Sequence, residues 1–136
     1  MADSRGASTT GWWLNHADEV FAYNEQRSVG TWVATITADA SQTVLRAQRP
    51  ITITKAAFIP DSAFQVGTMA LTNAGTAGTA TGTLASYTDH STLTAFLEQT
   101  LTLAATPTAA VGEVLAFKRT TTSGSATQGG GLVYIE

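Results

Sequence analysis

Cysteine is absent from this chain of 136 residues, and charged residues are scarce. Without cysteine, the chain can form neither disulfide bonds nor thiolate-based catalytic and zinc sites. Only 12% of the residues are charged, against roughly 25% in an average soluble domain. The net charge of −3 is small, and no apolar run approaches the ~20 residues of a membrane span. We therefore expect neither nucleic acid nor a membrane as a partner.

The few charges are unevenly distributed along the chain. Residues 51–112 hold only Lys55, Asp61, Asp89 and Glu98, while threonine and alanine fill much of the remaining sequence. A solitary soluble domain normally covers its surface with charge. A surface of small polar side chains can instead pack against another protein without stripping water from ions. The distribution favours a surface made for close packing, although a genomic preference for threonine and alanine would give the same composition.

Eight segments alternate between apolar and polar residues with a period of two. In the segment 51–59, one face is expected to hold Ile51, Ile53, Ala57 and Ile59, and Thr52 and Thr54 lie on the other. This alternation of β-branched residues is typical of a half-buried strand, and a proline stands at either side of the segment. The other strand-like segments are 31–38, 42–48, 67–73, 79–87, 99–105, 112–119 and 132–136.

About eight short strands joined by turn-rich links predict an all-β fold, an antiparallel β-sandwich of jelly-roll type. A single helical turn is expected at 91–98. Ser91 is a suitable N-cap there, and Leu93, Phe96 and Leu97 follow at helical spacing. A bulged strand is the alternative for this segment.

The beginning of the chain differs from the rest, so we divide it into an irregular N-terminal arm at 1–28 and a β-sandwich domain at 29–136. The arm shows little alternation but carries four large aromatic side chains. Such side chains each bury 150–250 Å² when they dock. They either fold back onto the sandwich or anchor the arm in a neighbouring protein. The candidate partner-binding anchors are Trp12, Trp13, Phe21 and Tyr23.

The chain contains no recognisable catalytic constellation. Residues 89–91 (Asp-His-Ser) have the side chains of a hydrolase triad, but consecutive residues cannot converge as a triad must. His16 has no second histidine at metal-ligand spacing. The glycine-rich segments 75–82 and 129–131 match no phosphate-binding pattern, and they predict a hairpin loop and a flexible loop. We expect no enzymatic activity, no cofactor and no metal.

Several strand and turn patterns resemble a group of small structural proteins encoded by tailed bacteriophages. The segment 49–63 (RPITITKAAFIPDSA) combines an I-T-I-T strand with a hydrophobic-x-P-D-x-A turn. Similar patterns follow in 69–73 (MALTN), 101–103 (LTL), 110–117 (AVGEVLAF) and 129–136 (GGGLVYIE). The resemblance extends over roughly residues 42–136.

The resemblance implies a virion component with a structural role. We expect a capsid decoration (cement) protein that binds the outer surface of the head shell and bridges its subunits. Its partners would be the major capsid protein and further copies of itself, with a trimer favoured, and it would be located on the capsid surface. The alternative is a fibre- or lectin-like module that binds a receptor or carbohydrate through Trp32 or through Tyr87 with Asp89 and His90.

Overall fold

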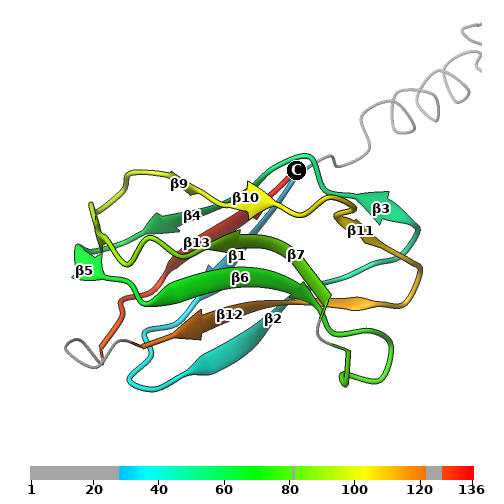
Figure 1. The fold of residues 1–136 in the computed structure, drawn as a ribbon, viewed down its shortest axis with the longest axis horizontal. Coiled ribbons are helices and arrows are strands. Elements are labelled where there is room, and N and C mark those ends of the chain that lie inside the picture. Colours follow the sequence, from blue (N-terminus) through cyan, green and yellow to red (C-terminus); the bar gives the residue numbers. More distant parts are fainter. Residues whose placement is uncertain (1–27, 81, 122–126) are drawn as a thin grey trace, which may run out of the picture.

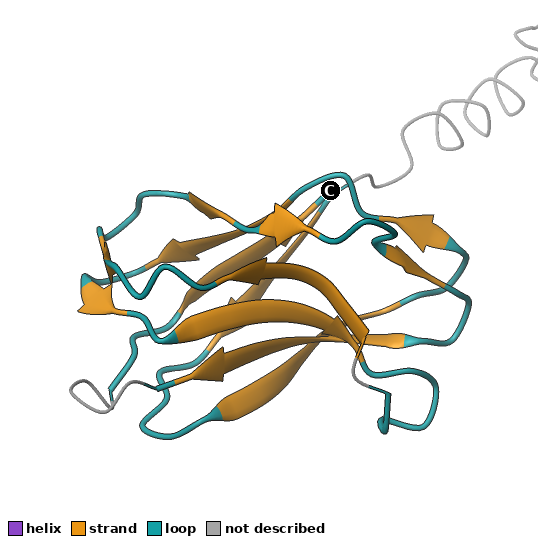
Figure 2. Cartoon of the chain, viewed as in Figure 1, coloured by secondary structure: helices purple, strands orange, loops and turns teal. Residues whose placement is uncertain are grey.

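The structure, a computed structural model, describes residues 28–80, 82–121 and 127–136. Two antiparallel sheets face each other, and the described residues contain no helix (Figure 2). The predicted all-β sandwich of antiparallel strands is therefore confirmed. Apart from Ser28, the N-terminal arm lies outside the described residues, and so do its candidate anchors Trp12, Trp13, Phe21 and Tyr23.

The two sheets contain nine strands, and Figure 1 shows the five-stranded sheet in front of the four-stranded one. In spatial order, the four-stranded sheet consists of β1 (Val29–Val33), β13 (Gly131–Ile135), β4 (Ala56–Pro60) and β9 (Gln99–Thr100). The five-stranded sheet consists of β10 (Thr102–Leu103), β7 (Gly82–Tyr87), β6 (Thr68–Asn73), β12 (Val114–Thr120) and β2 (Ala40–Arg46). Two short pairs lie at opposite ends of the sandwich, β3 (Ile51–Thr52) with β11 (Thr108–Ala109), and β5 (Phe64–Gln65) with β8 (Thr92–Leu93).

The strands are arranged in a nested order. The first strand, β1, pairs with the last, β13, and β2 pairs with β12 in the opposite sheet. This order agrees with the jelly roll that we predicted, and the jelly roll stays a prediction. The strand count differs, because the described residues form thirteen strands where about eight were expected.

The long run 51–59 is divided between two sheets. Its first part is β3 and its second part is β4, and the residues between them bond to other segments. The amide of Ile53 donates to the carbonyl of Pro107, and the amide of Thr54 donates to that of Glu136.

The alternation was predicted correctly for 51–54, but Ala57 and Ile59 do not share the face of Ile53, contrary to the prediction. Ile53 and Phe58 are core residues, while Ala57 and Ile59 lie on the opposite face of β4 from Phe58. The change of partner strand between β3 and β4 shifts the alternation.

The predicted helical turn at 91–98 is wrong. Part of the segment forms β8, which pairs with β5. Phe96 has a φ of 62°, in the left-handed region that an α-helix excludes. The Phe96 amide donates to the carbonyl of Pro60 at 2.7 Å, which holds the turn against β4. Phe96 and Leu97 are 79% and 63% exposed, so their helical spacing does not reflect burial.

The glycine run 129–131 is also not the flexible loop that we expected. Gly131 begins β13, and both Gly130 and Gly131 are buried. A Cβ at Gly131 would lie 2.4 Å from the carbonyl oxygen of Ile59, so the missing side chain lets β13 approach β4. In contrast, the segment 75–82 joins β6 to its antiparallel neighbour β7, which confirms the predicted hairpin.

The core fills the space between the two sheets. Phe58 of the four-stranded sheet stacks on Phe117 of the five-stranded sheet, with ring centroids 5.5 Å apart. Met69, Leu71 and Leu115 complete its centre and are fully buried. The outward faces of both sheets are not part of this core.

Candidate interaction surfaces

The outer face of the five-stranded sheet is built almost entirely from small side chains. Because Leu71 and Phe117 point into the core, their neighbours along β6 and β12 point outward, and the strand register brings these together with residues of β2, β7 and β10. We call this surface the threonine face. It consists of Ser41, Thr43, Thr68, Ala70, Thr72, Thr83, Ser86, Thr102, Ala116, Lys118 and Thr120.

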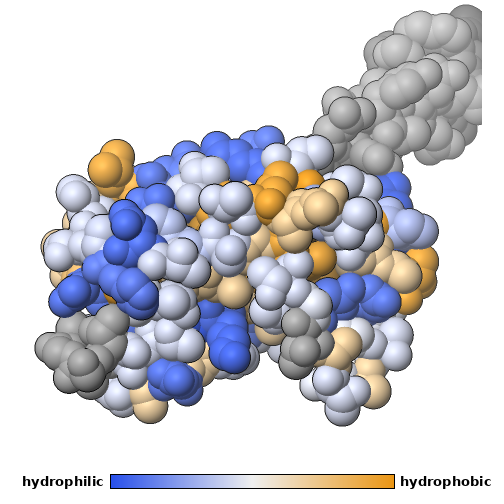
Figure 3. Space-filling model, viewed as in Figure 1, coloured by the Kyte–Doolittle hydropathy of each residue, from blue (hydrophilic) through white to orange (hydrophobic). Residues whose placement is uncertain are grey.

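The threonine face carries a single charge among these residues, that of Lys118. Two of its hydroxyl groups, on Thr68 and Thr120, bond to each other, and the Thr72 hydroxyl donates to the carbonyl of Ala116. A shallow hollow of about 400 Å³ lies over its centre. Figure 3 shows this side of the molecule as mostly pale, of intermediate hydropathy. Few ions would have to lose water if another protein covered this face.

The outer face of the four-stranded sheet has a different character. Trp32 of β1, Leu132 of β13 and Ile59 of β4 are register neighbours and form an apolar row across three strands. Trp32 is 55% exposed. Leu132 leans over Gly30, since a Cβ there would lie 3.1 Å from its Cδ1 atom. Exposed tryptophan beside apolar neighbours is typical of protein contact surfaces.

Charged groups border this apolar row. Lys55 forms a 2.7 Å ion pair with Glu98, and its ammonium group lies 5.7 Å from the centre of the Tyr134 ring. The hydrogen bond with Glu98 raises the pKa of Lys55. This ion pair therefore lies to one side of the apolar row.

A polar hollow of about 550 Å³ lies beside β7 and β9. It is lined by Ser86, Tyr87, Thr88, Asp89, Gln99, Thr100 and Thr102. The Tyr87 ring packs against the core, and its hydroxyl bonds to that of Ser91. The ring is thus held by the fold, unlike that of Trp32, which the structure exposes.

The structure does not assemble the triad-like residues 89–91 into a catalytic site. Ser91 bonds to Tyr87, while Asp89 and His90 are exposed, and His90 has a φ of 54°. No group of three or more histidine or acidic side chains that could hold a metal occurs among the described residues. The described part of the chain also has no helix suited to crossing a membrane.

Arg119 is a buried charge that the sequence analysis missed. It is 2% exposed, donates hydrogen bonds to the carbonyls of Gly129 and Ala34, and lies near the rings of Phe58 and Phe117. Burial lowers the pKa of Arg119 to about 10, so the group is still charged at neutral pH. Its contacts with backbone carbonyls indicate a structural role. The burial of Arg119 could have been predicted, because Arg119 falls at an inward-facing position of an alternating strand.

Comparisons of the chain with models of protein families, with curated proteins and with solved structures find no match. The surfaces described above and the resemblance of the strand patterns are therefore the basis for proposing a function. Sequence alternation predicted which residues of β6 and β12 share a face. It was wrong for β7, where a bulge puts Thr83 and Ala85 on opposite faces. It did not predict that Trp32, Leu132 and Ile59 lie side by side, because strand order decides this.

Proposed function

We propose that the chain is a structural protein of a tailed-bacteriophage particle, a capsid decoration (cement) protein that binds the outer surface of the head shell. The observation that carries this proposal is the threonine face, whose eleven residues include one charge, that of Lys118, and which the exposed Arg46 borders at the end of β2. Each unpaired charge buried in a contact would cost several kcal/mol. A face with almost none is suited to close packing between copies on a shell.

The two outer faces have different chemistry and serve different contacts in this proposal. The threonine face packs against neighbouring copies, with a trimer as the favoured oligomer. The apolar row, with Trp32 at one end, contacts the major capsid protein. In the arm, Trp12 and Trp13 are further anchors for the shell. In this proposal the protein is located on the virion surface and acts by binding, not by catalysis.

Stabilisation of the shell follows from mass action. A protein that binds the assembled shell and not the free subunits favours assembly by about 2.7 kcal/mol per site at a concentration of 100 times Kd. A trimer that engages several shell subunits at once gains further through effective concentration.

Co-sedimentation tests this proposal. Head shells of the virus that encodes the chain, stripped of their outer proteins, are mixed with increasing amounts of the purified chain. We expect saturable binding, and a loss of at least tenfold in affinity for Trp32→Ser. Thr106→Ser, at an exposed loop position outside both faces, is the matched control. A chain that stays in the supernatant with intact shells, or binds only to tails, would contradict the proposal.

A second candidate function is a receptor- or carbohydrate-binding module of a fibre. Two separate places favour it: the polar hollow, whose lining includes Tyr87 and Asp89, and the exposed ring of Trp32 on the other sheet. A glycan array distinguishes the two functions. Reproducible glycan binding that is lost in Trp32→Ser or Asp89→Asn, together with no binding to shells, would replace the capsid proposal.

A further inference from the structure

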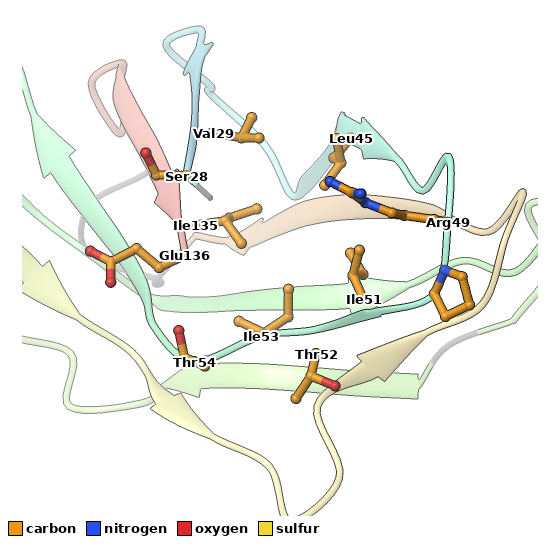
Figure 4. A pocket seen from close by; sticks show the side chains of 11 residues that line it. Ser28, Val29, Leu45, Arg49, Ile51, Thr52, Ile53, Thr54, Ile135 and Glu136 are labelled. Carbon is orange, nitrogen blue, oxygen red and sulfur yellow. The ribbon is translucent and has the colours of Figure 1, made fainter. Parts of the chain in front are cut away.

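An open pocket of about 520 Å³ lies at the end of the sandwich where β1, β2 and β3 meet the end of β13 (Figure 4). Five apolar side chains from these strands and the adjoining residue 53 point toward one another into it: Val29, Leu45, Ile51, Ile53 and Ile135. Its remaining lining is Ser28, Arg49, Pro50, Thr52, Thr54 and Glu136. The pocket thus has an apolar floor and a mainly polar rim.

The floor of this pocket is continuous with the core. Ile53 and Ile135 are buried core residues, and Leu45 and Ile51 pack against the core while remaining partly exposed. Leu45 belongs to one sheet and Ile135 to the other. An apolar side chain seated here would close this end of the sandwich and bury area on both sheets.

The position of Ser28 indicates what occupies the pocket. Ser28 is part of the lining, so the 27 preceding residues lead to its edge. Tyr23 lies five residues before Ser28 and Phe21 seven. Five extended residues span at most about 17 Å, which allows the chain to turn back and place either ring over the floor. An aromatic side chain matches the apolar floor.

The rim does not decide the occupant, because the Glu136 carboxylate already accepts a hydrogen bond from the Tyr134 hydroxyl at 2.7 Å. The apolar floor and the short connection from Ser28 point to the segment just before it. We propose that Phe21 and Tyr23 of the chain's own N-terminal segment fill this pocket. The inference goes beyond the proposed function and does not depend on it.

The chain's own N-terminal segment is favoured over a second copy of the chain as the occupant of the pocket. A connection of a few residues gives an effective concentration in the millimolar range, which a separate molecule reaches only when it is crowded. The arm is then divided into two parts. Under this proposal, Phe21 and Tyr23 occupy the pocket, and Trp12 and Trp13 are left as the candidate anchors for a partner.

Disulfide trapping tests this inference, because the chain has no cysteine of its own. The full-length variant with Tyr23→Cys and Thr54→Cys places one thiol in the segment and one on the exposed rim. The matched control combines Tyr23→Cys with Thr83→Cys on the threonine face. We expect at least a tenfold higher yield of a disulfide within one chain for the first pair, measured by mass spectrometry. Equal yields, or disulfides only between two chains, would overturn the inference.

A second measurement does not depend on engineered thiols. Phe21→Ala with Tyr23→Ala should shift the methyl NMR signals of Ile51, Ile53 and Ile135, whereas Trp12→Ala with Trp13→Ala should leave them unchanged. Signals that respond to neither double variant would also overturn the inference. Neither outcome involves head shells, so this result stays separate from the co-sedimentation experiment.

Discussion

Arg119 donates a hydrogen bond of 2.6 Å to the carbonyl oxygen of Gly129, just before the last strand begins. The same guanidinium group donates to the carbonyl of Ala34, just after the first strand ends. Arg119 itself belongs to β12, in the opposite sheet. One buried side chain therefore links the five-stranded sheet to both segments that flank the β1–β13 pair.

Arg119→Met should lower the free energy of unfolding by about 2–4 kcal/mol, because two carbonyls would lose their charged donor inside the protein. Urea denaturation measures this change. Lys118→Met is the matched control, since Lys118 is the exposed neighbour in the same strand, and we expect a change within about 0.5 kcal/mol. Equal effects of the two substitutions would show that the buried hydrogen bonds do not stabilise the fold.

Gly131→Ala should destabilise the protein by about 1–3 kcal/mol through overpacking. The added methyl group would meet the backbone oxygen of Ile59 at 2.4 Å and the Phe58 ring at 2.8 Å, and backbone cannot move aside cheaply. Gly82→Ala is the control, because its Cβ would have no heavy atom within 4 Å. Thermal unfolding compares them. A similar melting temperature for the two variants would disprove the proposed close approach of β13 to β4.

These two positions show where prediction from the sequence ends. Alternation predicted the strands because side-chain direction in a strand is a local property, and the two faces of 51–54 agree with the structure. The roles of Arg119 and Gly131 depend on which strands become neighbours. The distance between Gly131 and Ile59 cannot be inferred from the residues around either one in the sequence. The glycine run was therefore predicted to be a loop.

The candidate surfaces, like the fold, could be predicted from the sequence only in part. The scarcity of charge in 51–112 predicted a surface for close packing, and the threonine face draws most of its residues from that range. Its other members, such as Thr43 and Thr120, come from strands on either side of the range, because β2 and β12 join the same sheet. The helical spacing of Phe96 and Leu97 led to the wrong prediction of a helical turn. The carbonyl of Pro60, at the end of another strand, accepts a hydrogen bond from this turn and holds it in a different conformation.

Glu113 should give the protein a pH-dependent contribution to stability. Hydrogen bonds from the Asn73 side chain and the Ala110 amide hold the pKa of the Glu113 carboxyl below its ordinary value of 4.5. A carboxyl whose pKa is lowered by folding stabilises the protein above its unfolded pKa, and this contribution is lost as the pH falls through the folded pKa. The stability difference between the wild type and Glu113→Gln should therefore be constant from pH 6 to 8 and shrink below about pH 4.5.

Urea denaturation across this pH range measures the effect. Asn73→Ala is the companion variant, because it removes the larger cause of the pKa shift while keeping the carboxyl group. It should reduce the pH dependence attributed to Glu113. A stability difference that does not change between pH 3 and pH 7 would contradict the assignment.

Charges placed on the threonine face should block its contacts without unfolding the protein. Thr43 and Thr83 are exposed positions on β2 and β7, and both lie outside the core. The double variant Thr43→Glu with Thr83→Glu should change the free energy of unfolding by less than about 1 kcal/mol. It should weaken self-association at least tenfold, since each buried unpaired carboxylate costs several kcal/mol. Urea denaturation measures the stability, and analytical ultracentrifugation measures self-association. Thr106→Glu, in a loop outside the face, should leave both unchanged, and an equal loss for this control would mean that added negative charge acts through the whole molecule and not through the threonine face.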